Sequence, residues 1–196
     1  MARPREFDLD FALEQAMNVF WEKGYEGAGL NELLSAMHIA RGSLYKAFGD
    51  KRALFLATLA HYDKTCIGES LDLLSNKSVA DGAERIVKLM ENIALAVEVH
   101  GDRRGCFLCN SVVDQAPHDK EIESLCQRMM GRMERGFVIA LKASKKAETV
   151  TQERLIENAR NLNVTYNGLR VMAKAGYSAD DIRRAIDTAL QEIGIG

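Results

Sequence analysis

Apolar residues recur at helical spacing along most of this chain. In residues 30–51 they outline two short helices joined by a tight turn at 38–40. In the second helix, Leu44 and Phe48 lie four residues apart and face inward. The inward stripe of the first helix falls at positions i, i+3, i+4 and i+7, which are Leu30, Leu33, Leu34 and Met37.

The same spacing leaves a polar, basic and aromatic face on the second short helix. Arg41, Ser43, Tyr45 and Lys46 are expected to point away from the core. A helix this short is unstable alone and needs packing support. With donors and a phenol on its outer face, it suits the major groove of DNA. The pattern therefore predicts DNA binding.

The rest of the chain predicts an all-α protein of about nine helices, because it shows no strand-like alternation and contains only two prolines. We expect an N-terminal helix-turn-helix domain over residues 1–50 and a larger helical domain for effector binding and dimerisation over 51–196. The N-caps are expected at Asp8, Asp50 and Ser178, and a capping box is expected at Ser78 with Asp81. The other expected helices cover 9–23, 106–115, 120–146, 152–175 and 179–193.

The two closing helices carry more apolar surface than one buried stripe needs, with Val164 and Val171 on a second side of the first. Two explanations remain open: a central helix within one chain, or a two-helix face that pairs with a second copy. We expect the second, and the predicted dimer residues are Leu155, Ala159, Leu162, Tyr166, Leu169, Ile182, Ile186 and Leu190.

Charge adds little to the DNA-binding prediction. The whole chain has a net charge of −2, and residues 1–52 hold seven Lys and Arg against eight Asp and Glu. Locally, Arg41, Lys46, Lys51 and Arg52 are opposed only by Asp50. Arg3 and Arg5 stand on a short N-terminal arm. Because such clusters are common on helical surfaces, the helix pattern is the stronger indicator.

Several motifs follow one another along the chain from the end of the first helix. Phe20, Gly24 and Tyr25 close that helix, and Leu33 and Ala36 follow. The run Gly42-Ser43-Leu44-Tyr45 with Phe48 and Lys51 has the pattern G-x-L-Y-x-x-F-x-x-K. Two further motifs are RGCFLCN at 104–110 and NGLRVMAKAG at 167–176. Together these motifs resemble those of the TetR family of bacterial transcriptional regulators.

The resemblance implies a homodimeric repressor of a palindromic, double-stranded operator, released when a small molecule of unknown identity binds the second domain. The alternative is a helical small-molecule-binding protein with an impaired DNA-reading helix, since Ala28 and Gly29 replace hydroxyl residues common in the family. The expected DNA-binding residues are Arg3, Arg5, Gly29, Arg41, Gly42, Ser43, Tyr45, Lys46 and Lys51. The expected effector pocket comprises Cys106, Cys109, Asn110, Val113, Met129, Met133, Phe137, Tyr166 and Arg170.

Four cysteines allow three interpretations, of which small buried residues come first. A thiol sensor at Cys106 and Cys109 is the second, because Arg103 and Arg104 could lower a thiol pKa. A metal site is the third and lacks further ligands at suitable spacing. We expect no metal, no cofactor and no catalytic activity. The absence of a membrane-length apolar run or a signal core predicts a cytoplasmic protein without a membrane partner.

Overall fold

The computed structural model describes residues 7–195, and every regular element in that part of the chain is helical. None of its helices combines the length and apolar character needed to cross a membrane. The helix α4 passes through the π-helical turn η1 into α5 without a break. The elements are α1 (Leu9–Gly27), α2 (Leu30–Met37), α3 (Arg41–Phe48), α4 (Lys51–Tyr62), η1 (Asp63–Ile67), α5 (Gly68–Ser75), α6 (Gly82–His100), α7 (Phe107–Asp114), α8 (Lys120–Lys142), η2 (Lys145–Glu148), α9 (Gln152–Lys174) and α10 (Ala179–Glu192).

The chain divides into two compact units that differ from the predicted division after residue 50. The first unit comprises Met1–Cys66 and Asn110–Cys126, and the second comprises Ile67–Cys109 and Gln127–Gly196. Helix α4 belongs to the first unit because it packs against α1, where Phe20 and Phe55 meet edge to face with ring centroids 5.0 Å apart. The segments α4–η1–α5, α7 and α8 each contribute residues to both units.

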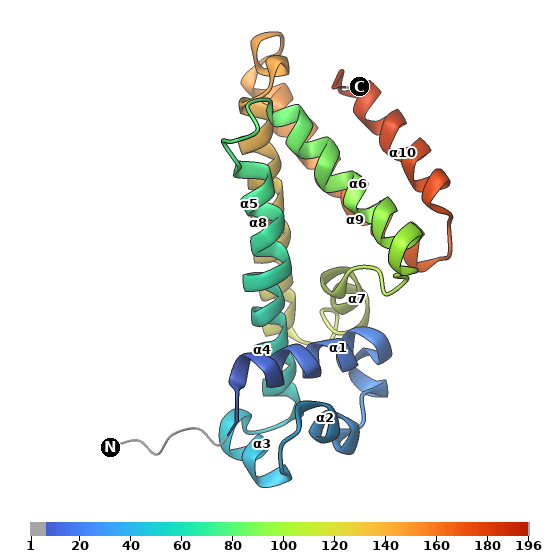
Figure 1. The fold of residues 1–196 in the computed structure, drawn as a ribbon. Helices are drawn as coiled ribbons and strands as arrows, with labels where there is room; N and C mark the ends of the chain where they lie inside the picture. Colours follow the sequence, from blue (N-terminus) through green and yellow to red (C-terminus); the bar gives the residue numbers. More distant parts are fainter. Residues whose placement is uncertain (1–6, 196) are drawn as a thin grey trace. The chain divides into compact units, whose positions relative to one another are not determined.

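The predicted helix-turn-helix is present as α2 and α3 (Figure 1). Leu33 and Met37 of α2 are buried, and so is Leu44 of α3. Between the helices, His38 adopts the left-handed conformation at φ 55°, and the next amide, Ile39 N–H, donates to the carbonyl oxygen of Leu34. This closing pattern satisfies the last carbonyls of α2 and turns the chain toward α3.

A glycine interrupts α1 where the sequence predicts its end. Gly24 has φ 72° and ψ 173°, a region that is accessible essentially only to glycine. One further turn follows, so that α1 reaches Gly27 instead of stopping at Lys23. The predicted N-caps Asp8 and Asp50 are confirmed, because their carboxylates accept hydrogen bonds from the amides of Phe11 and Ala53.

The predicted capping box at Ser78 is wrong. Asp81 is itself the N-cap of α6 and accepts from the amide of Ala83, whereas the Ser78 amide and hydroxyl bind the side chain of Asn76. The first residue of α6, Gly82, lies so close to α8 that only glycine fits there. A Cβ atom on Gly82 would lie 1.8 Å from the carbonyl oxygen of Ala140. Helix α8 ends at Lys142, four residues earlier than predicted.

The substitution Gly82→Ala is expected to lower the free energy of unfolding by about 1–3 kcal/mol or more, because the added methyl group would overlap backbone atoms of Ala140. Urea denaturation followed by circular dichroism measures this loss. Gly42→Ala is the matched control, since nothing lies within 4 Å of a Cβ there, and it should raise the unfolding free energy by up to about 1 kcal/mol. Equal stability of the two variants would contradict the close α6–α8 contact.

In the second unit, α6 packs against α9 and α10. The predicted N-cap Ser178 of α10 is confirmed, and it forms a capping box in which Ser178 and Asp181 exchange side-chain and backbone hydrogen bonds. The ion pairs of Arg183 with Glu91 and Glu98 join α10 to α6.

The apolar stripe predicted to form the dimer interface is instead buried within a single chain. A residue that its own chain already covers cannot contact a partner without refolding, so this set belongs to the core of the second unit. Its members are Leu155, Ala159, Leu162, Tyr166, Leu169, Ile182, Ile186 and Leu190. The periodicity identified an apolar face correctly, but this face packs against the same chain and not against a partner chain. The second side of α9, which carries Val164 and Val171, is the exposed one.

Candidate DNA interface and effector cavity

The outer face of α3 presents the side chains that the sequence predicts. Arg41, Tyr45 and Lys46 are exposed, and Ser43 is half-buried, while Leu44 between them anchors the helix from the inside. The Arg41 guanidinium donates to the Asn31 side-chain oxygen at 3.0 Å. Gly42 is exposed and leaves the backbone of the first turn open to close approach. This face can therefore offer a guanidinium, an ammonium and a phenol to a polyanion.

Two positions flank this face. Lys51, at the start of α4, places its Nζ atom 4.6 Å from the ring centre of Tyr25, a cation–π contact that orients the ammonium group. Tyr25 itself contacts Phe20 and Phe55, and burial raises the pKa of its phenol. Gly29 is the N-cap of α2 and makes no side-chain capping bond. Arg3 and Arg5 lie outside the described residues.

An ion-pair cluster that the sequence did not predict joins α4 to the start of α8. Arg52 donates from Nε and Nη2 to the Asp119 carboxylate at 2.6 and 2.9 Å, and from Nη2 to Glu121 at 2.8 Å. Nearby, the Asp114 carboxylate accepts from the amide of Tyr25 at 3.2 Å. The Arg52 guanidinium is thus bound by two carboxylates. Together with the Asp114 contact, these ion pairs connect residues 110–126 to the rest of the first unit.

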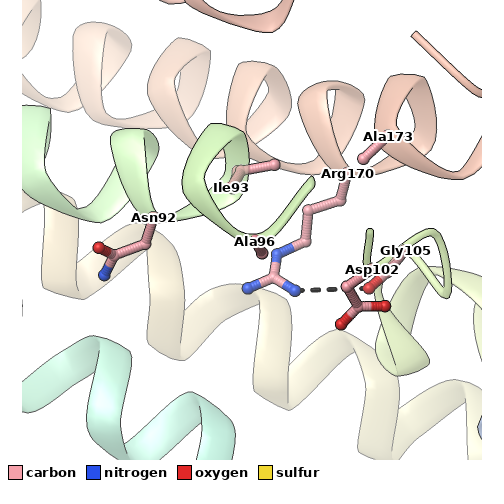
Figure 2. A pocket seen from close by; sticks show the side chains of 7 residues that line it. All are labelled: Asn92, Ile93, Ala96, Asp102, Gly105, Arg170 and Ala173. Atoms are coloured by element: carbon pink, nitrogen blue, oxygen red, sulfur yellow. Dashed lines mark hydrogen bonds between the residues drawn. The ribbon is translucent and has the colours of Figure 1, made fainter. Parts of the chain in front are cut away.

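The second unit contains a small cavity of about 50 Å³ between α6, α9 and the loop before α7. Figure 2 shows Arg170 extending from α9 toward the loop residues Asp102 and Gly105. Its Nη2 donates to the Tyr166 hydroxyl at 2.8 Å, and its Nη1 contacts the Gly105 carbonyl oxygen at 3.5 Å. The remaining lining residues are Asn92, Ile93, Ala96 and Ala173.

Comparisons with known proteins agree with this geometry. The family profile of bacterial regulatory proteins of the tetR family matches residues 12–58, which include α2 and α3. The uncharacterized HTH-type transcriptional regulator YezE of Bacillus subtilis is 30% identical over 97% of this chain and 98% of its own. The chain belongs to the TetR family.

Two further relatives are similar over nearly their whole length. The HTH-type transcriptional repressor ComR of Escherichia coli is 26% identical over 96% of this chain and 90% of its own. A cysteine-substituted variant of the TetR family regulator CifR, solved with a 26-base-pair operator duplex, is 29% identical. Its structure superimposes with a TM-score of 0.82 over 96% of this chain and 98% of that one.

In this TetR-family chain, the cavity coincides with the predicted effector pocket at one residue, Arg170. Val113 is 81% exposed on α7, so its assignment to an enclosed pocket is wrong. Asn110 and Val113 also belong to the first unit, whereas Arg170 belongs to the second. The predicted pocket residues that are packed in the core are Cys106, Met129, Met133, Phe137 and Tyr166.

The cysteines have defined surroundings. Cys109 lies half-buried with its Sγ 3.1 Å from the side-chain oxygen of Asn167, and Cys106 is buried. Arg104, one of the two arginines expected to favour a thiolate, is paired with Asp102 at 3.0 Å. Among residues 7–195, no group of three or more His, Cys, Asp and Glu side chains is arranged to hold a metal ion.

The Asp119 cluster predicts a pH-dependent contribution to stability. The hydrogen bonds from Arg52 lower the pKa of Asp119 to about 2, so the folded state favours the carboxylate. The stabilisation is therefore complete above the ordinary pKa near 3.8 and is lost as the pH falls toward 2. Asp119→Asn should be less stable than the unmodified chain at about pH 7, and the difference should narrow toward about pH 3.

Urea denaturation midpoints at several pH values measure this difference. Asp187→Asn, which alters an exposed carboxylate on α10, is the control and should behave like the unmodified chain. If the stability difference between Asp119→Asn and the unmodified chain stayed constant with pH, ionisation of Asp119 would not contribute to the stability of the fold.

Proposed function

We propose that this protein is a homodimeric repressor that binds a palindromic operator through paired α3 helices. The observation that carries the proposal is the division of α3 into a buried anchor, Leu44, and an exposed face with Arg41, Tyr45 and Lys46. Arginine can bind guanine edges, and lysine and tyrosine can bind phosphates. Lys51 and the backbone at Gly29 would add phosphate contacts at the margins.

The second side of α9 is the surface proposed for dimerisation, with a second copy of this chain as its occupant. Ile156, Val164 and Val171 follow each other at eight and seven residues, so they lie along one side of the helix, and all three are exposed. At Gly168, within the same stripe, nothing lies within 4 Å of a Cβ position, which leaves room for a partner helix.

A groove of about 320 Å³ between α9 and α10 continues this surface, and Val164, Thr165 and Ala189 are among its lining residues. Isologous pairing through this face would place two α3 helices on one operator. Their spacing must match one turn of DNA, about 34 Å, or a multiple of it.

Release from the operator is proposed to follow from an effector bound in the second unit. The segment α4–η1–α5 and the helix α8 contribute to both units, so a change in one unit can reach the other through continuous backbone. The π-helical turn at Asp63–Ile67 lies at the junction, and such turns are frequent at functional sites. A coupling free energy of about 1–3 kcal/mol would suffice for a useful switch.

Thiol modification is the second candidate signal. Cys109 contacts Asn167, whose side-chain nitrogen donates to the Asn163 carbonyl oxygen at 2.8 Å, so alkylation of Cys109 would disturb α9. Operator affinity of the reduced protein is measured before and after treatment with iodoacetamide. A loss of affinity on alkylation indicates thiol modification as the signal, and an unchanged affinity leaves the bound effector. The double variant Cys106→Ser/Cys109→Ser serves as the control, and its operator binding should not respond to the reagent.

The experiment that tests the proposed function is fluorescence anisotropy with the DNA upstream of the protein's own gene, over a range of salt concentrations. A repressor should bind this DNA at least about a thousandfold more tightly than unrelated DNA. The alternative, a ligand-binding protein with an impaired reader, is favoured by the missing side-chain cap at Gly29. It predicts weak binding with equal affinity for both DNAs.

A further inference from the structure

We propose that the cavity beside Arg170 holds the carboxylate group of the effector, a small organic acid. This inference rests on the release mechanism proposed above and adds the chemical class of the ligand. The cavity volume of about 50 Å³ sets the size. It corresponds to about four water molecules, and hence to an acid of about two to four carbon atoms. Drug-sized ligands need several times that volume.

The guanidinium of Arg170 is positioned to bind such a group. Its Nη2 donates to the Tyr166 hydroxyl, its Nη1 contacts the Gly105 carbonyl oxygen, and its carbon Cζ lies 5.0 Å from the Tyr166 ring centre. These contacts hold the planar fork in one orientation at the cavity wall (Figure 2). A planar carboxylate can accept two parallel hydrogen bonds from such a fork, whereas an ammonium group would be repelled.

The charges around the loop favour an anion. The stem of Lys174 packs against Gly105, and Arg103 lies against Gly176. The acidic lining residue Asp102 is paired with Arg104, and hydrogen bonds from Arg104 together with the charges of Arg104 and Arg170 lower the pKa of Asp102. One carboxylate thus faces two guanidinium groups, which leaves a net positive charge. Arg170, Arg103 and Lys174 therefore leave this end of the second unit positive.

Two acidic residues lie on α6, the helix that forms one cavity wall. Glu91 and Glu98 both pair with Arg183 of α10. Their charges are thus directed to α10 and do not cancel the positive charge of Arg170.

The apolar part of the cavity lining favours a hydrocarbon tail over an inorganic anion. Ile93, Ala96 and Ala173 line the cavity, while Asn92 is exposed and supplies a polar group at the margin. A short acid can therefore place its carboxylate at Arg170 and its carbon atoms against the alkyl side chains. This division of polar and apolar walls distinguishes the site from a phosphate site.

Isothermal titration calorimetry of the full chain with butyrate, butyramide and inorganic phosphate at constant ionic strength tests the inference. Butyrate should bind at one site per chain, and butyramide should bind at least about tenfold more weakly because it lacks the charge. Arg170→Met should weaken butyrate binding by at least about tenfold. Arg154→Gln, which removes a positive charge elsewhere on α9, is the control and should retain butyrate binding.

Ala96→Leu keeps Arg170 but fills the cavity, so it tests the site even if Arg170→Met fails to fold, and it should lose butyrate binding. The inference is overturned if wild-type protein binds no butyrate, if butyramide binds equally well, or if phosphate binds more tightly. Unchanged operator affinity in saturating butyrate would overturn the role of the site in release. Failure of the proposed function is a separate result, namely no specific operator binding in the absence of any ligand.

Discussion

Replacing Tyr45 with alanine is expected to weaken operator binding at least tenfold without changing the fold. Tyr45 is 47% exposed on the outer face of α3, and the adjacent Leu44 anchors the helix. A hydrogen bond from the phenol to a charged phosphate is worth about 1.5–3 kcal/mol, and a dimer would lose one at each half-site. Fluorescence anisotropy with the upstream DNA measures the loss.

Tyr177→Ala provides a matched control, because Tyr177 is 50% exposed and lies in the turn between α9 and α10. This variant should bind DNA with unchanged affinity. Lys46→Ala adds a second signature, since the loss of one phosphate contact should reduce the slope of log affinity against log salt by about 1 per half-site. If Tyr45→Ala and Tyr177→Ala bound the operator with equal affinity, Tyr45 on α3 would not contribute to the DNA interface.

Replacing Val164 with lysine is expected to convert the dimer to monomers and thereby abolish tight operator binding. Val164 is 67% exposed on the second side of α9, the surface proposed for pairing. In a symmetric interface the substitution would bury two ammonium groups without partners, a cost of several kcal/mol. Sedimentation velocity measures the oligomeric state, and anisotropy measures the consequence for DNA.

The control for this variant is Val99→Lys, because Val99 is 65% exposed but lies on α6. Its dimer should persist, and operator affinity should stay within about twofold of the unmodified chain. If Val164→Lys remains dimeric, the two chains pair through another surface. If both variants are monomeric, the result reflects general destabilisation, and the assignment to α9 fails.

The sequence predicted the helix-turn-helix closely because its determinants are local. The spacing of Leu33, Met37 and Leu44 defines the buried side, and the caps Asp8 and Asp50 mark the helix starts. These signals act within a few residues of one another and need no knowledge of the rest of the chain.

The contacts that the sequence could not predict join distant segments. Arg52 and Asp119 are 67 residues apart, and no local pattern links them. The cavity likewise depends on the packing of α6, α9 and a loop, so only Arg170 among its lining residues was identified. The stripe at Leu155–Leu169 shows a further limit, because periodicity reveals an apolar face but not whether the same chain or another one covers it.

Hydroxyl-radical footprinting on the DNA upstream of the protein's own gene shows whether paired α3 helices read the operator. A dimer bound to a palindrome should give two protected segments related by a two-fold axis, with centres one DNA turn of about 34 Å, or a multiple of it, apart. Both should disappear together in Tyr45→Ala/Lys46→Ala and in Val164→Lys. A single protected segment, or protection that survives the α3 double variant, would contradict the proposal that paired α3 helices read the operator.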